Sequence, residues 1–399
     1  MPVLHPDLTV WCRSLALLIV LGFGLTQPIA GQQAWAAEPY TARHEQVLGT
    51  SLDLVIHADD AEVIEQAEAT VLAEIDRLAA ILSTWDASSE FRRWHGAPPA
   101  PRAASPELFE VLSLCDLWKT TSGGAFNPSA QAICALWKAG AQTGQAPGDN
   151  LLKQAVQQAA APAWKLSAEN HTALRLNDCP VTLDALAKGY IVEQATVTTL
   201  RRLPQVRGLV VAIGGETRVA GDIDHEIRIT NPFADADNAP SIARVTLRNR
   251  ALGTSGGYRR GVHIAGRWYS HIVDPRTGQP VDHIASSTAI ANTTADADAL
   301  ATIFSVLPVA ESLALADRLP GVACLLVTRD GTRITSQNWQ QLTTVSNAGA
   351  RDTTLAAVTP TEDRQAESTP AAEKDQKEDA TDTDGGAAWD EDFEMLVQF

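Results

Sequence analysis

The sequence of 399 residues has no excess of basic residues, few cysteines and no long hydrophobic run. It carries 31 Lys and Arg against 48 Asp and Glu, which gives a formal net charge of −17. That balance offers no basic footprint for nucleic acid, so we exclude nucleic acid as a partner. Of the five cysteines, none stands in the closely paired spacing of metal-binding or redox motifs, so we assign them no chemistry.

The first 36 residues have the pattern of a secretory signal peptide. Arg13 precedes an apolar run at residues 14–25 that is short for a membrane span. Residues 34–36, Ala-Trp-Ala, place small side chains at the two positions that signal peptidase reads, so we predict cleavage before Ala37. We therefore expect an exported protein of the periplasm or cell envelope, soluble after cleavage. An uncleaved segment would instead anchor it to the membrane.

Acidic residues are concentrated near the other end of the chain. Residues 343–399 hold 14 Asp and Glu against 4 Lys and Arg, which leaves a net charge of −7 for everything before them. Residues 349–388 have almost no large apolar side chains, a composition that favours disorder. Residues 389–399 become apolar again, as a docking peptide or as the first strand of a further module. The predicted parts are a signal peptide (1–36), a catalytic domain (37–345) and a disordered acidic tail with a short apolar end (346–399).

Hydrophobic patterns between these ends predict helices and short strands in mixed order. We predict helices at residues 61–82, 106–120 and 184–200, another around Asp298, and a loosely helical insertion at 139–161. Strands are predicted as a pair within 40–57, as short strands within 164–183, and at 209–213, 226–229, 243–247, 251–254, 262–264, 268–272, 286–291 and 322–328. Helices mixed with mostly antiparallel strands indicate the α+β class.

The densest group of chemically active side chains lies at residues 271–278. An imidazole (His271), a carboxylate (Asp274) and a guanidinium (Arg276) fall within six residues, and Pro275 and Gly278 favour a turn that keeps them on a loop. His271 or Asp274 could accept a proton from a hydroxyl, with the imidazole titrating near 6.5. The alternative is that His271 only hydrogen-bonds the loop.

A second candidate site opens the apolar helix around residue 298. Asp298 and Thr302 stand four residues apart, so their oxygens share one helical face. Hard oxygen ligands suit Mg²⁺, which takes one or two carboxylates and leaves its other positions to water and phosphate. An Asp and a Thr near a helix start are also typical helix caps, and spacing alone favours that alternative.

Two glycine-rich segments offer backbone N–H groups to an anion. The first, residues 122–128, lets the backbone approach a ligand closely through Gly123 and Gly124, although a simple turn between helices is an equally good interpretation. The second is residues 255–258. Trp85 is the one aromatic residue in the polar segment that follows the first predicted helix.

Taken in order, these segments resemble the FAD:protein FMN transferases, the ApbE-like flavin transferase family, over residues 40–342. The likeness rests on several separate motifs in the order of that family. They are Gly49-Thr50, residues 82–90, Gly124-Ala125-Phe126-Asn127-Pro128, Ala187-Lys188-Gly189-Tyr190, Gly214-Gly215, Ser255-Gly256-Gly257, residues 271–278 and residues 297–302.

The resemblance implies a Mg²⁺-dependent reaction in which FAD is split at its diphosphate. FMN passes to a threonine hydroxyl of an exported or membrane-associated acceptor protein, and AMP leaves. The implied metal ligands are Asp298, Thr302 and the backbone oxygen of Ala185. The implied FAD contacts are Leu48, Trp85, Ala125, Phe126, Asn127, Thr182, Lys188 and Ile272, with His271 as the catalytic candidate and Asp274 as the next one.

The sequence departs from the family pattern near the implied flavin and metal positions. Thr182 stands where the family usually has Asp, with Asp184 two residues later, while Leu48 replaces a common Met and Asn127 a common Asp. Two alternatives therefore stay open beside the transferase. One is an FAD pyrophosphatase, in which water replaces the threonine hydroxyl, and the other is an inactive flavin-binding protein.

Overall fold

The computed structural model describes residues 38–234, 240–257 and 260–343. The predicted signal peptide and the predicted acidic tail therefore lie outside the described residues. Within those described ranges, no helix has both the length and the apolar character needed to cross a membrane.

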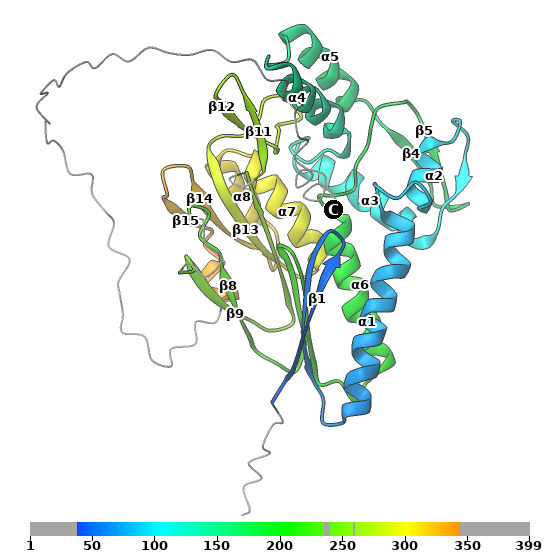
Figure 1. Ribbon diagram of the computed structural model, residues 1–399, viewed down its shortest axis with the longest axis vertical. Helices are drawn as coiled ribbons and strands as arrows, with labels where there is room; N and C mark the ends of the chain where they lie inside the picture. Colours follow the sequence, from blue (N-terminus) through cyan, green and yellow to red (C-terminus); the bar gives the residue numbers. More distant parts are fainter. Residues whose placement is uncertain (1–37, 235–239, 258–259, 344–399) are drawn as a thin grey trace, which may run out of the picture. The chain divides into compact units, whose positions relative to one another are not determined.

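An eight-stranded sheet forms the centre of the described fold, and every neighbouring pair of strands is antiparallel (Figure 1). In spatial order the strands are β1 (Tyr40–Val47), β2 (Thr50–His57), β6 (Gly208–Ile213), β7 (Glu216–Gly221), β10 (Arg250–Gly256), β13 (Ile284–Ala291), β14 (Ala323–Thr328) and β15 (Arg333–Thr335). Together with the helices that pack on it, this sheet confirms the predicted α+β class.

The two faces of the sheet bury different hydrophobic clusters, as the side-chain alternation of β6 shows. Leu209 and Val211 join the main core, which is shared with the helices, whereas Val210 belongs to a smaller cluster on the opposite face. The main core is covered by α1 (Ala61–Leu82), α3 (Pro106–Thr121), α6 (Ala187–Arg202), α7 (Thr294–Val306) and α8 (Val309–Arg318). The smaller cluster is covered by the hairpin of β8 (His225–Ile229) and β9 (Ala243–Leu247) and by α9 (Trp339–Leu342).

A third hydrophobic cluster lies beside the predicted catalytic loop. It joins α4 (Gln131–Thr143), α5 (Asp149–Ala160) and the hairpin of β11 (Gly261–Ile264) and β12 (Arg267–Ser270), with Trp137, Leu152 and Val273 buried between them. The predicted insertion at 139–161 is confirmed as helical, but the expected looseness is wrong, because it holds the end of α4 and all of α5, packed as a pair. The remaining elements are α2 (Glu90–Gly96), η1 (Pro128–Ala130) and a small sheet of β3 (Arg102–Ala103), β5 (Thr172–Arg175) and β4 (Trp164–Ser167).

Several elements of this fold were not predicted from the sequence, among them β7, α2 and α8. The Glu-Thr-Arg-Val-Ala-Gly sequence of β7 is polar or small at most positions, so it lacks a hydrophobic signal. It forms a strand because β6 and β10 hydrogen-bond it on both sides. The helices α2 and α8 have only 7 and 10 residues, too few for a clear helical period.

Helix α7 packs unusually close to its neighbours because two glycines face it. A Cβ at Gly189 of α6 would lie 2.3 Å from the carbonyl oxygen of Thr294, and a Cβ at Gly253 of β10 would lie 2.6 Å from that of Ala297. This close packing brings the second turn of α7 against the first turn of α6. At one end of the central strands, β2 begins, β6 ends, β7 begins and β10 ends.

Candidate functional site

Three charged side chains form a buried cluster where α6, α7 and the start of β7 meet. The Lys188 Nζ lies 3.2 Å from Oε2 of Glu216, whose side chain is almost fully buried. Asp298 is also buried, and its Oδ2 accepts a hydrogen bond of 3.0 Å from the backbone N–H of Gly189. Two carboxyl groups and one ammonium therefore share an interior space, and we call these three residues the charge cluster.

The electrostatics of the charge cluster follow from its burial. Desolvation raises the pKa of Asp298 well above its usual value, the Glu216 charge adds to this, and the Lys188 charge opposes it. The pKa of Lys188 is raised, chiefly by the Glu216 carboxylate, so its ammonium stays charged at neutral pH. A further positive charge close to Asp298 would therefore stabilise its ionised carboxylate.

Neither Asp298 nor Thr302 caps helix α7. Thr293 is the N-cap of α7: its Oγ1 accepts a hydrogen bond of 3.2 Å from the Asp296 N–H and donates one of 2.7 Å to the Asp296 carboxylate. Asp298 instead faces α6, and Thr302 lies one turn further along α7, partly exposed. Both side chains are therefore available for other partners.

The oxygens around Asp298 fit a hard divalent cation. Its Oδ1 has no hydrogen bond with the described residues, nor has the hydroxyl of Thr302. No group of three or more His, Cys, Asp or Glu in the described part of the chain has metal-binding geometry. A cation here would need, beside one carboxylate, neutral oxygens such as the Thr302 hydroxyl and the Ala185 carbonyl, together with oxygens of water or of the substrate.

The segment before α6 connects the candidate FAD contacts from three parts of the chain. The Thr182 N–H donates to the Pro128 carbonyl at 3.1 Å, which attaches the glycine-rich loop at 122–128. The Thr84 hydroxyl donates to Asp184 at 2.7 Å, which attaches the segment carrying Trp85. The Thr182 hydroxyl accepts a hydrogen bond of 3.3 Å from the Asp184 N–H, so this departure from the family pattern stabilises a local turn.

The predicted FAD contacts divide into buried and accessible side chains. Leu48, Ala125, Phe126 and Ile272 are buried. The backbone N–H groups of Ala125 and Phe126 already donate to the carbonyl and the hydroxyl of Ser122, at 3.3 and 2.9 Å. Trp85 is 42% exposed on its loop, as a stacking ring would need to be. Asn127 uses its amide within the fold, donating to the Ala159 carbonyl at 2.8 Å and accepting from the Ser129 N–H at 3.0 Å.

Leu48 has an uncommon backbone conformation for its residue type. It sits in the turn between β1 and β2 with φ of 51°, in the left-handed region, which glycine adopts far more easily than leucine. Its side chain is buried in the main core, which holds the turn in this conformation. The turn between β6 and β7 lies beside the start of β2, because the Gly214 N–H donates to the Ser51 carbonyl at 3.4 Å.

His271 lies between β12 and β13 and has a defined tautomer. Its Nδ1 is 3.0 Å from the Arg260 carbonyl oxygen, which can only accept, so Nδ1 carries the hydrogen and Nε2 keeps a lone pair. Desolvation, aided by the charges of Arg260 and Lys188, lowers the pKa of His271 to about 4. His271 is nevertheless an exposed residue, so water offsets part of this desolvation; the lowered pKa keeps the imidazole neutral at pH 7. The titration expected near 6.5 is therefore displaced towards acid.

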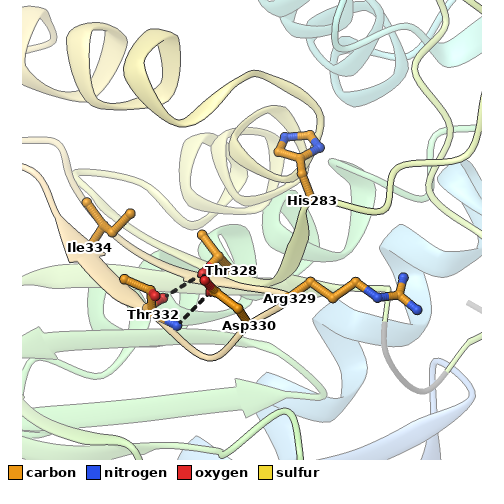
Figure 2. A pocket seen from close by; sticks show the side chains of 6 residues that line it. All are labelled: His283, Thr328, Arg329, Asp330, Thr332 and Ile334. Atoms are coloured by element: carbon orange, nitrogen blue, oxygen red, sulfur yellow. Dashed lines mark hydrogen bonds between the residues drawn. The ribbon is translucent and has the colours of Figure 1, made fainter. Parts of the chain in front are cut away.

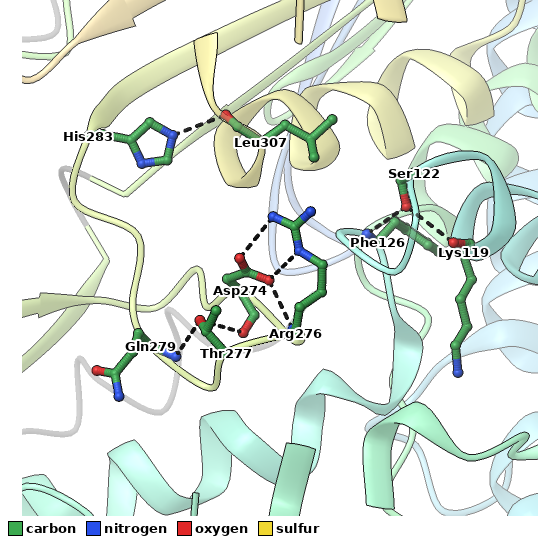
Figure 3. A network of polar contacts seen from close by, with 9 residues as sticks. All are labelled: Lys119, Ser122, Phe126, Asp274, Arg276, Thr277, Gln279, His283 and Leu307. Carbon is green, nitrogen blue, oxygen red and sulfur yellow. Dashed lines mark hydrogen bonds and ion pairs between the residues drawn. The ribbon is translucent and has the colours of Figure 1, made fainter. Parts of the chain in front are cut away.

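Asp274 is fully engaged in its own loop (Figure 3). Its two carboxylate oxygens each lie 2.9 Å from a guanidinium nitrogen of Arg276, and its backbone oxygen accepts from the N–H groups of Thr277 and Gly278. The Arg276 side chain extends beside the loop that carries Ser122 and Phe126, with its Cγ 3.7 Å from the position of a Cβ on Gly124. Asp274 therefore organises the turn and is poorly suited to accept a proton.

Helices α4 and α5 pack against the His271 loop. The indole N–H of Trp137 donates to the Gly278 carbonyl at 2.9 Å, and the turn at Gly278 packs against Leu152 and Val156. Val273 pairs with Pro280 across the loop. The segment that the sequence marked as an insertion is therefore part of the support for a candidate catalytic residue.

Two cavities lie outside the charge cluster. One of about 410 Å³ lies at the turn between β14 and β15, and none of the predicted site residues lines it (Figure 2). It is lined by His283, Thr328, Arg329, Asp330, Thr332 and Ile334. The other, of about 200 Å³, is lined in part by Asn127, Asp116 and Lys119.

Sequence reasoning missed Glu216 as a site residue. The only signal was its position after Gly214-Gly215, at the end of a turn, and its nearest charged neighbour in sequence, Arg218, pairs with Glu193 instead. Its partners, Lys188 and Asp298, come from helices 28 residues before it and 82 residues after it. Only the packing of α6 and α7 reveals the cluster.

Comparison with known proteins agrees with this architecture. The family model described as the ApbE family matches residues 48–326. An FAD:protein FMN transferase of Treponema pallidum is 32% identical over 252 residues, covering 59% of this chain and 69% of that protein. One of Escherichia coli strain K12 is 24% identical over 309 residues, covering 74% of this chain and 86% of that protein.

Two solved structures share the fold. The ApbE protein of Thermotoga maritima superposes with a TM-score of 0.67 at 23% identity, covering 76% of this chain and 99% of that one. The apo form of the flavinyl transferase ApbE of Pseudomonas stutzeri superposes with a TM-score of 0.63 at 23% identity, covering 76% and 97%. These likenesses describe the fold alone.

Proposed function

The chain belongs to the ApbE family, and from this premise we propose that it is an FAD:protein FMN transferase. The acceptor group is the hydroxyl of a threonine on a partner protein. Its oxygen attacks the phosphorus on the FMN side of the FAD diphosphate. A new P–O bond forms, the bond to the bridging oxygen breaks, and AMP leaves with that oxygen. The hydroxyl proton passes to a base on the enzyme.

Asp298 and Thr302, with the Ala185 carbonyl, are the proposed ligands of Mg²⁺. When bound, that ion neutralises the diphosphate as negative charge moves onto the leaving AMP phosphate. The observation that carries this assignment is the buried Asp298 carboxyl, which within residues 38–234, 240–257 and 260–343 accepts from a single N–H, at Oδ2, and has no partner at Oδ1. The ammonium of Lys188, held nearby, is the proposed second cationic contact of the diphosphate.

His271 is the proposed base. Its lowered pKa keeps the ring neutral, and the hydrogen bond from Nδ1 leaves Nε2 free to accept the threonine proton. Trp85 is the proposed stacking surface for a ring of FAD, because its exposed indole lies on a segment bonded to the one that precedes Lys188.

An assay with purified protein, FAD and Mg²⁺, with and without an acceptor protein, separates the possible activities. A transferase yields AMP and covalently flavinylated acceptor in equal amounts. A pyrophosphatase yields AMP and free FMN without needing the acceptor. Intact FAD recovered from the protein would mean a flavin-binding protein without activity, and would contradict the proposal.

We further propose that the protein is exported and that it acts on an exported or membrane-associated acceptor. The support is the pattern of residues 1–36, with its short apolar run and Ala-Trp-Ala site. Expression of the full chain followed by mass spectrometry of the mature N-terminus tests this. A chain that begins at Ala37 is expected, whereas an intact N-terminus on a protein in the cytoplasmic fraction would contradict export.

A further inference from the structure

The charge cluster contains one ammonium and two carboxyl groups that could each pair with it. The structure has Lys188 on Glu216, at 3.2 Å, and not within ion-pair distance of Asp298. Oε2 of Glu216 is buried and has no well-aligned hydrogen bond among the described residues, so the contact with Lys188 is its electrostatic partner. In the described part of the chain, the hydrogen-bond donor to the Asp298 carboxyl is the backbone N–H of Gly189.

We infer that Glu216 is a positioning residue that keeps Lys188 away from Asp298, so that the Asp298 carboxylate stays available to a divalent cation. This inference rests on the metal site of the proposed function. Without the Glu216 charge, the buried ammonium would have Asp298 as its nearest strong counter-ion. A direct pair between the two would engage the carboxylate oxygen that the cation needs.

The net charge of the cluster also predicts weaker cation binding when the Glu216 charge is removed. Glu216, Lys188 and Asp298 together carry a net charge of −1 when all three are ionised. Replacing Glu216 by glutamine makes the cluster neutral, and replacing Lys188 as well makes it −1 again. In an interior of effective dielectric constant near 20, one unit charge a few ångströms away changes cation affinity by about ten-fold or more.

A second, largely buried ion pair, between α6 and β7, provides a matched control. Oε2 of Glu193 on α6 lies 3.1 Å from Nε of Arg218 and accepts from the N–H and hydroxyl of Thr294, at 2.8 and 3.0 Å. Glu193 is therefore a buried carboxylate that holds the start of α7 but has no contact with Lys188. Its glutamine variant should lose stability without losing cation affinity.

The experiment measures Mn²⁺ binding by electron paramagnetic resonance on the full chain without FAD. The variants are Glu216→Gln, Lys188→Met, the double variant and Glu193→Gln. We expect Glu216→Gln to bind Mn²⁺ about ten-fold or more weakly, and the double variant to recover to within about three-fold of the wild type. Lys188→Met alone should bind at least as tightly as the wild type, and this arm still tests the inference if Glu216→Gln does not fold.

Each other result overturns the inference in a recognisable way. If the double variant stays as weak as Glu216→Gln, Glu216 is itself a ligand or a purely structural residue. If Glu216→Gln binds like the wild type, or if Lys188→Met binds more weakly, Lys188 does not compete for Asp298. If the wild type binds no Mn²⁺ and Asp298→Ala is no different, the proposed metal site fails together with the inference.

Discussion

The charge cluster and the His271 loop hold their charged groups in opposite ways. In the cluster, Lys188, Glu216 and Asp298 come from distant parts of the sequence and are buried by the packing of α6 and α7 on the sheet. In the loop, Asp274 and Arg276 are two residues apart, partly exposed, and paired with each other. The cluster therefore holds two carboxyl groups and one ammonium in the interior, whereas in the loop one carboxylate and one guanidinium neutralise each other.

Because of this difference, substitutions in the charge cluster and in the His271 loop should have effects of different size. A buried carboxyl with a raised pKa interacts strongly with any cation that arrives, so its loss removes a large electrostatic effect. An exposed ion pair contributes about 1 kcal/mol or less to stability, because water screens both partners. The comparison predicts a large effect on chemistry from the cluster and a small one from the pair in the loop, with His271 in between.

The largest effect is expected for Asp298→Ala, which should abolish AMP release from FAD. The variant should stay folded, because it removes a carboxyl group that is costly to bury. Thr293→Ala on the same helix is the control: loss of this N-cap should cost about 1 kcal/mol of stability and leave AMP release unchanged. Unfolding followed by circular dichroism, with AMP measured by chromatography, gives both values. AMP release by the wild type that persists in EDTA would contradict the assignment.

Thr302→Ala should reduce AMP release less than Asp298→Ala does. A neutral hydroxyl gives a cation a weaker ligand than a carboxylate, and Thr302 is partly exposed, so water can replace it. Raising the Mg²⁺ concentration should restore much of the rate in Thr302→Ala and none in Asp298→Ala. Equal loss in the two variants, without rescue, would place Thr302 in another role.

His271→Gln should slow flavinylation of the acceptor by about 10² to 10⁴-fold while FAD and Mg²⁺ still bind, the usual contribution of a positioned acid–base group. The base must be neutral, and its pKa is lowered to about 4, so activity is present above that pKa and lost as pH falls through it. Wild-type transfer should therefore stay level from pH 8 to about pH 6 and decline only in more acidic buffer. Parallel losses of FAD binding and transfer in the variant would mean that His271 is structural.

Asp274→Asn should reduce transfer by less than about ten-fold. Asparagine keeps a side-chain oxygen that can accept a hydrogen bond from the backbone N–H of Arg276, whose nitrogen lies 2.9 Å from Asp274 Oδ1 in the wild type. The substitution removes only the ion pair with the guanidinium. Measured beside His271→Gln in the same assay, this variant decides which of the two candidates is the base. A loss as large as that of His271→Gln would transfer the role to Asp274.

Deletion of residues 349–399 should have the smallest effect, with FAD turnover unchanged. The composition of residues 349–388 favours disorder, and such a segment adds little to a packed site. Turnover of free FAD by the shortened and full chains is compared at equal protein concentration. A large fall would show that the apolar residues at 389–399 act on the catalytic domain.

Much of the fold could be predicted because its main helices and strands carry their own signals. The helix at 61–82 has a regular apolar face and was predicted with the bounds of α1, and the strand pair at 40–57 alternates around Gly49. β7 could not be predicted, since its polar sequence becomes a strand only between two neighbours. The packing role of α5 was equally hidden, because it depends on the loop at Gly278.

The candidate site was predictable in its residue types but not in its electrostatics. Asp298 and Thr302 stand at helical spacing, yet spacing could not distinguish a metal site from a cap; the capping bonds of Thr293 and Asp296 show that neither residue caps α7, and the metal site stays a prediction. Likewise, Asp274 looked as capable of catalysis as His271 until its bidentate pair with Arg276 was seen. Partners that are distant in sequence decide what each of these groups can do.

The most direct test of the proposed site is a crystal structure of the protein with Mn²⁺ and FAD, with the metal located by its anomalous scattering. The account predicts an anomalous peak bonded to Asp298 Oδ1, with the Thr302 hydroxyl and the Ala185 carbonyl as its other protein ligands and Lys188 still on Glu216. A peak at any other position, or one bonded to Glu216 with Asp298 paired to Lys188, would contradict it.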